Sequence, residues 1–145
     1  MPSLFDDLTS RDPHRIWSAS SEVALSRDLA ELRFLASRLD EIRRATAGVD
    51  LGGLLYPNAA RLGFAFDKLA FVAGNRGCLC ALYPDYLFFQ PERERDARHV
   101  RVLAQQDDLE NWSVTYTCQC AYCGATFDVE QGEYHYTWWQ WRVRR

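Results

Sequence analysis

The sequence predicts an α+β protein in which a long N-terminal amphipathic helix packs on a C-terminal antiparallel sheet held by a metal knuckle. Three observations lead to this prediction. Apolar residues recur every three or four positions between Ser20 and Ala45, which is typical of a helix with one buried face. From Trp112 onwards apolar and polar residues alternate, which is typical of half-buried strands. Five cysteines fall into two short clusters, at 78–80 and 118–123.

Length and composition indicate one packed domain. The chain has 145 residues, of which 48% are hydrophobic and 14% aromatic. We expect a single domain over residues 1–145, mainly helical over 1–50, mixed over 51–110 and a sheet over 111–145. A secretory signal and an apolar run of membrane-spanning length are both missing from the sequence, which predicts a cytoplasmic protein without a membrane partner. The net charge of −3 does not resemble the basic character of most nucleic-acid-binding domains.

The long helix is expected to begin at Ser20 or Ser21, which can cap its first turn, and to end near 45–48. Covering a sheet of the same domain is favoured over a coiled-coil dimer, because the apolar repeat is short. The stripe that would face the sheet consists of Leu25, Leu29, Leu32, Leu35 or Ala36, Leu39 and Ile42.

The middle of the chain is less regular. Residues 59–73 fit either a strand or a buried helix, and their alanines favour the helix. Cys78–Tyr83 reads as a short strand that ends at Pro84. The charged run that opens 92–105 fits a solvated helix or a loop, and the apolar residues after it fit a short strand or the inner side of a helix. Strands are expected at 112–118, 125–130 and 133–143, the last two joined by a Gln131-Gly132 turn.

The cysteines have the spacing of metal ligands. Cys78 and Cys80 would point to one side of a strand, and Cys120-Ala-Tyr-Cys123-Gly124 forms a corner at which two sulfurs face one point. The preferred ligand set is Cys78, Cys80, Cys120 and Cys123, with Cys118 as a substitute for Cys120. The alternative is a group of buried thiols without a metal.

The Cys120–Cys123 corner and the hairpin after it resemble the knuckle of zinc-ribbon proteins, over the C-terminal third of the chain only. The resemblance implies a structural Zn²⁺. The first cysteine pair departs from that family, because it is Cys-x-Cys where zinc ribbons have Cys-x-x-Cys. Four thiolates would leave no open position for a water, so the zinc is expected to be structural and not catalytic.

The expected hairpin register predicts a second feature. With a turn at Gln131-Gly132, Asp128 lies opposite His135, and one sheet face becomes acidic and aromatic. Such a face fits a protein partner with a basic surface. Its tryptophans could instead be covered by another part of the chain. The predicted partner-binding residues are Asp128, Glu130, Glu133, His135, Trp139 and Trp141.

These features predict a non-enzymatic, zinc-stabilised protein-binding module, such as an immunity protein that neutralises a basic toxin or nuclease. Asp128 could orient His135 for catalysis, but no nucleophile is placed beside the pair. The alternative function is a zinc-ribbon-like nucleic-acid-binding protein, in which three arginines contact phosphates and Trp139 and Trp141 stack on bases. The arginines are Arg142, Arg144 and Arg145.

Overall fold

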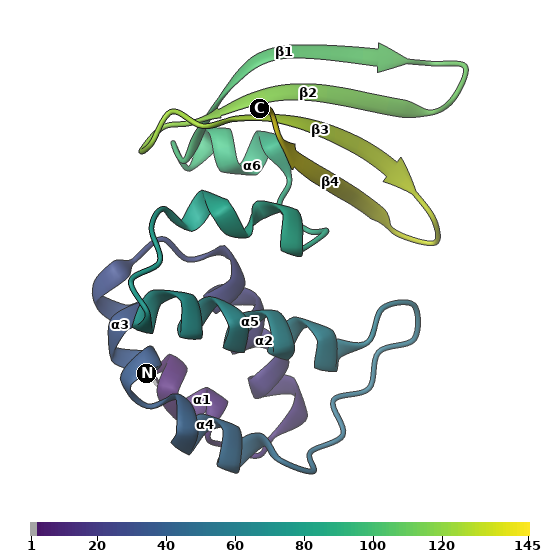
Figure 1. Cartoon of the computed structure of the whole chain (residues 1–145). Coiled ribbons are helices and arrows are strands. Elements are labelled where there is room, and N and C mark those ends of the chain that lie inside the picture. The colour runs from purple at the N-terminus through teal and green to yellow at the C-terminus, as the bar shows by residue number, and fades with distance from the viewer. Residues whose placement is uncertain (1–2) are drawn as a thin grey trace. The chain divides into compact units, whose positions relative to one another are not determined.

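The computed structural model describes residues 3–145, which form two compact units with the boundary between Arg76 and Gly77. The helical unit contains α1 (Leu4–Leu8), α2 (Pro13–Leu25), α3 (Leu29–Ser37), α4 (Leu39–Thr46) and α5 (Asn58–Ala73). The sheet unit contains the 3₁₀ helix η1 (Leu79–Asp85), α6 (Pro91–Asp96), β1 (Val100–Asp108), β2 (Ser113–Cys120), β3 (Thr126–Glu133) and β4 (Thr137–Val143) (Figure 1). Each unit has buried side chains of its own, and the expectation of one domain over 1–145 stays a prediction.

The expected long helix is wrong, because three shorter helices occupy the stretch from Ser20 to Ala45. The Asp28 side chain accepts a hydrogen bond from the Glu31 amide and so caps the start of α3. A second break lies at Arg38, which separates α3 from α4. Asp and Ser side chains compete for backbone N–H groups and start helices, so they override an apolar repeat that continues through them.

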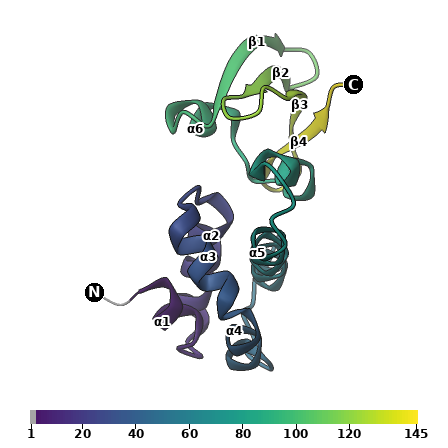
Figure 2. The ribbon, with the colours of Figure 1, turned by 60° about the vertical axis from the view of Figure 1, so that its left-hand side comes forward.

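Residues of the predicted apolar stripe are buried between the helices of the helical unit. Figures 1 and 2 show α5 beside α2 and α3, and these helices pack on one another. The preference for a helix at 59–73 is confirmed, since α5 covers this stretch. In the part of the chain that the structure describes, none of the helices has the length and apolar character needed to span a bilayer. The core includes Val23, Ala24, Leu32, Leu35 and Leu69.

Lys68, the one lysine of the chain, is buried in α5 with 2% of its surface exposed. Its ammonium group donates to the carbonyl oxygens of Ala24 at 2.8 Å and Ser26 at 2.6 Å. These carbonyls lie where α2 ends, so Lys68 satisfies acceptors that the helix itself leaves unpaired. It thereby fixes the break between α2 and α3.

Lys68→Met should destabilise the helical unit by about 2 kcal/mol, because it removes the ammonium group that donates to the buried Ala24 carbonyl and the part-buried Ser26 carbonyl. Urea unfolding followed by far-UV circular dichroism measures the change. Arg44→Met, at an exposed position of α4, is the control and should change stability by less than about 0.5 kcal/mol. Equal midpoints for the two variants would contradict this role of Lys68.

The sheet is antiparallel throughout, in the order β1-β2-β3-β4. One face is largely buried, and η1 and α6 lie on that side of it (Figure 1). Tyr83 of η1 stacks on Trp141 of β4 with ring centroids 4.2 Å apart and meets Phe127 of β3 edge-on at 5.6 Å. Aromatic contacts therefore fix η1 to the sheet.

In this unit the structure contradicts one local prediction and decides another that was left open. The expected strand Cys78–Tyr83 is wrong, since the chain forms η1 here, with Pro84 inside it. The stretch 92–105 contains both of its alternatives, because α6 takes the charged run and β1 begins at Val100. Pro91 stands at the start of α6, where its missing N–H costs nothing.

The predicted hairpin register is also wrong. β3 continues through Gln131 and Gly132, so Asp128 pairs with Arg142 and Val129 with Trp141. Gly132 pairs with Trp138, and a β-carbon at Gly132 would clash with the Trp138 indole. The glycine is thus needed for close approach of a ring and not for a turn.

Gly132→Ala should destabilise the sheet unit by about 1–3 kcal/mol, because the Trp138 ring must move to admit a methyl group. Thermal unfolding followed by tryptophan fluorescence measures this change. The same substitution at Gly63 of α5 is the control. An added β-carbon there meets no atom within 4 Å, so it should stabilise the helix by about 0.5–1 kcal/mol. A stabilising Gly132→Ala would contradict the tight glycine–tryptophan pair.

Candidate metal centre

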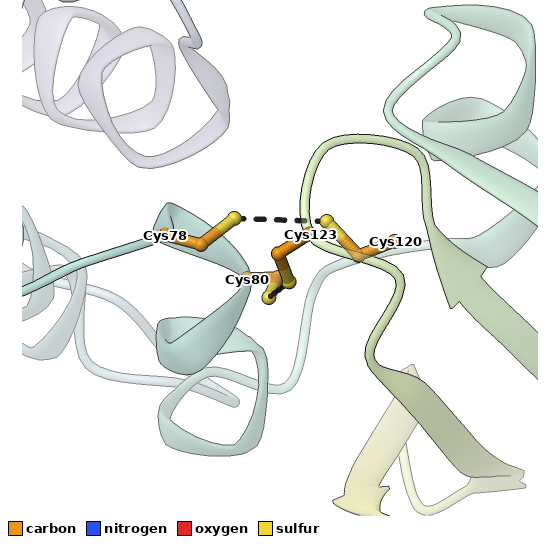
Figure 3. A group of neighbouring side chains, drawn as sticks. All are labelled: Cys78, Cys80, Cys120 and Cys123. Atoms are coloured by element: carbon orange, nitrogen blue, oxygen red, sulfur yellow. Dashed lines mark hydrogen bonds between the residues drawn. The ribbon is translucent and has the colours of Figure 1, made fainter.

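Four cysteines from two distant segments meet in the sheet unit (Figure 3). Cys78 directly precedes η1, and Cys80 lies in its first turn. Cys120 is the last residue of β2, and Cys123 lies in the turn that leads to β3. The start of η1 is therefore joined to the β2–β3 turn.

The β2–β3 turn has the hydrogen bonds of a metal knuckle. The Gly124 amide donates to the Cys120 carbonyl at 3.0 Å, which closes the turn. The Tyr122 amide donates to the Cys120 Sγ at 3.4 Å, a contact that favours a negatively charged sulfur. Gly124 has a φ of +80°, which a residue with a side chain rarely adopts. The Cys-x-x-Cys-Gly spacing thus directs both sulfurs to one point.

The distances between sulfurs fit a tetrahedral metal site. The Sγ atoms of Cys78 and Cys120 are 3.6 Å apart, and those of Cys80 and Cys123 are 3.4 Å apart. All four Sγ atoms lie within 4.8 Å of one another. A tetrahedron with Zn–S bonds of ~2.3 Å has sulfurs about 3.8 Å apart. The four thiols could therefore hold one metal ion with only small side-chain shifts.

Electrostatics also favour a cation among these sulfurs. Burial raises the pKa of the Cys80 thiol, and hydrogen bonds to Cys123 and Cys78 and the nearby Cys120 raise it further. Several thiolates in one place repel one another, and a divalent cation offsets this repulsion.

Cys118 does not belong to the cluster. It is wholly buried on the inner face of β2, and burial raises the pKa of its thiol to about 12. Its role as a substitute ligand has no support from the geometry, because Cys120 already occupies the position beside Cys78.

The six predicted partner-binding residues do not share one face. Trp141 is wholly buried, and its indole N–H donates to the Phe89 carbonyl at 2.8 Å. Trp139 lies on the same sheet face as Trp141, whereas Asp128 and Glu130 lie on the opposite face. Glu133 ends β3, and its carboxylate accepts a hydrogen bond from the Thr137 hydroxyl at 3.2 Å.

The structure does not bring Asp128 and His135 together. His135 lies in the β3–β4 turn with a φ of +61°, far along the hairpin from Asp128. Asp128 instead forms an ion pair with Arg144, which holds the pKa of its carboxyl group below its usual value. The register error is the reason for both differences, since it moved the turn by several residues.

A feature that the sequence interpretation missed is the distribution of charge along the strands. The two hairpin turns lie at one end of the sheet, which we call the turn end, and the cysteine knuckle lies at the other. The turn end carries Asp107, Asp108, Glu110 and Glu133. Arginines gather at the knuckle end, namely Arg98, Arg101, Arg142, Arg144 and Arg145.

Exposed apolar side chains also gather at the turn end. Leu109 and Trp112 in the β1–β2 turn are 85% and 86% exposed, and Tyr134 in the β3–β4 turn is 69% exposed. The acidic segment 107–111 was the feature of the sequence that could have indicated this surface, because it predicts a polar turn directly before Trp112.

Comparison of the chain with family models, with curated proteins and with solved structures found no match.

Proposed function

We propose that the sheet unit is a non-enzymatic protein-binding module stabilised by one structural Zn²⁺. The observation that carries this proposal is the approach of four Sγ atoms to within 4.8 Å of one another. Four thiolates in a tetrahedron are the ligands that zinc takes in structural sites. In this arrangement Cys78, Cys80, Cys120 and Cys123 bind the ion and fix η1 against the β2–β3 turn.

A structural role is supported by the ligand number. Four sulfur ligands complete a tetrahedral zinc site and leave no position for a reactive water. The metal then contributes folding free energy, which a small unit with a limited core needs. Free thiols that bind zinc also fit a reducing compartment such as the cytoplasm.

The turn end is the proposed contact surface, and the proposed partner is a protein with a basic surface. The sheet unit has ten Asp and Glu against seven Arg, whereas the helical unit has ten acidic and ten basic residues. The net negative charge therefore belongs to the sheet unit. Carboxylates around exposed Trp112 and Leu109 would steer a basic partner and give it an apolar anchor. A toxin or nuclease neutralised by this protein is the kind of partner we propose.

The nucleic-acid alternative has less support. Arg144 is paired with Asp128, and Arg142 Nη1 lies 3.7 Å from Glu130 Oε2. Of the two tryptophans that would stack on bases, Trp141 is wholly buried. Two of the five arginines at the knuckle end are therefore paired with carboxylates, and burial of Trp141 removes one of the two stacking rings that the alternative requires.

Affinity isolation from the native host with the full, zinc-loaded chain tests the contact surface. Trp112→Ala with Glu110→Lys removes the apolar anchor and reverses a charge, so it should abolish capture of a basic protein. Arg101→Ala at the knuckle end is the control and should retain it. If every recovered protein stays bound to the turn-end variant, the proposed surface is wrong. Recovery of nucleic acid that is lost steeply with salt would support the alternative instead.

A further inference from the structure

A hollow of about 430 Å³ lies on the inner face of the sheet at the turn end. All four strands and the start of α6 contribute to it, so its walls belong to regular structure of one unit. It combines carboxylates, amides and aromatic rings. The lining residues that matter for binding are Glu92, Asp107, Tyr116, Gln131 and Trp139.

The hollow is negatively charged. Glu92 and Asp107 line it, and among the described residues around it none is Lys, Arg or His. Within residues 3–145 neither carboxylate takes part in a salt bridge. The Tyr116 hydroxyl donates toward Glu92 Oε1 at 3.5 Å, and burial together with the charges of Glu92 and Asp107 raises the pKa of Tyr116 to about 12. The negative charges of Glu92 and Asp107 therefore both act on the Tyr116 hydroxyl group inside the hollow.

The aromatic wall is fixed in place. The Trp139 indole N–H donates to Gln131 Oε1 at 2.9 Å, and the Trp139 backbone N–H donates to the Leu87 carbonyl at 2.9 Å. Gln131 Oε1 also lies 3.2 Å from the Tyr116 hydroxyl. The N–H groups of Trp139 already have acceptors, so the part of this side chain that a ligand can contact is the π surface of its ring. The acceptors available to a ligand are the two carboxylates.

We infer that this hollow binds an arginine side chain of the basic protein partner. A guanidinium group can stack on the face of an indole while its planar N–H groups donate to carboxylates. An ammonium group of lysine lacks this planar set of donors, so arginine fits the combination better. An anionic group would be repelled, and an apolar one would leave Glu92 and Asp107 without a compensating charge. This inference rests on the proposed function, because the arginine belongs to the basic protein that is proposed to bind the turn end.

The probe is the tripeptide acetyl-Gly-Arg-Gly-amide, titrated into the zinc-loaded full chain. Its citrulline counterpart has nearly the same shape without the charge and serves as the ligand control. The indole N–H signal of Trp139, assigned with Trp139→Phe, reports binding in two-dimensional ¹H–¹⁵N spectra. We expect dissociation constants in the millimolar range for arginine and at least about tenfold weaker binding for citrulline.

Glu92→Gln with Asp107→Asn removes both charges and keeps acceptors for Tyr116 and Gln105. This variant should bind the arginine peptide at least about tenfold more weakly. Asp96→Asn, at an exposed position of α6 outside the hollow, should change affinity less than about twofold, since an exposed charge contributes little. Equal binding of both peptides, or no shift of the Trp139 signal in the millimolar range, would overturn the inference. Zinc content and capture of the partner are measured separately, so the proposed function can stand when this inference fails.

Discussion

Removal of the metal is expected to unfold the sheet unit while the helices α1–α5 remain folded. All four cysteines of the candidate metal centre lie in the sheet unit, where they bring the start of η1 beside the β2–β3 turn. Structural zinc contributes roughly 10–16 kcal/mol in small domains, which is as large as the whole stability of a typical one. The helical unit contains none of these four cysteines and has its own buried residues, so chelation should leave its helical signal.

Metal analysis of the purified chain should give one zinc per molecule. Titration with a chelator should then remove the near-ultraviolet circular dichroism of the sheet unit's tryptophans and retain most of the far-ultraviolet helical signal. Four of the five tryptophans lie in this unit, so the two signals report on different parts of the chain. Because thiolates and not thiols bind the ion, less chelator should suffice as the pH falls.

Two cysteine substitutions give a matched comparison. Cys120→Ser removes a ligand and should reproduce the effect of chelation. Cys118→Ala removes a buried thiol that is no ligand, so it should keep one zinc per chain and cost about 1–2 kcal/mol of stability. Purified protein without metal and with five free thiols would contradict the zinc site, and so would loss of zinc in Cys118→Ala.

The knuckle could be predicted because its geometry is local. Cys120, Cys123 and Gly124 lie within one turn, where sequence spacing determines which atoms can meet. The alternation at 112–118 likewise predicted β2, since a strand with one buried face repeats every second residue. The strand predicted at Cys78–Tyr83 was wrong, yet both of its cysteines reach the cluster from η1.

The register of the last hairpin could not be predicted from local signals. Gln131-Gly132 fits a two-residue turn, but the glycine is needed beneath the ring of Trp138, which comes from the facing strand. The turn is made instead at 134–136, where His135 adopts a positive φ without being glycine. A contact between strands thus overrode a sequence signal for a turn, and the predicted partner face changed with it.

Trp141→Ala should unfold the sheet unit or destabilise it by about 3–5 kcal/mol. Trp141 is wholly buried, stacks on Tyr83 at 4.2 Å and meets Phe127 edge-on at 5.7 Å. Its indole N–H donates to the Phe89 carbonyl at 2.8 Å, so the substitution also removes this buried hydrogen bond. Chemical unfolding followed by near-ultraviolet circular dichroism measures the loss.

Two further variants separate packing from binding. Trp141→Phe keeps an aromatic ring beside Tyr83 and should lose less stability than Trp141→Ala, because part of the packing remains. Trp112→Ala removes a side chain that is 86% exposed and should change stability by less than about 0.5 kcal/mol. If Trp141→Ala stayed fully stable and lost a partner instead, Trp141 would be a contact residue, as the sequence had predicted. If the Trp141 substitution lowers stability, Trp141 belongs to the core. If the Trp112 substitution abolishes binding without lowering stability, Trp112 belongs to the contact surface.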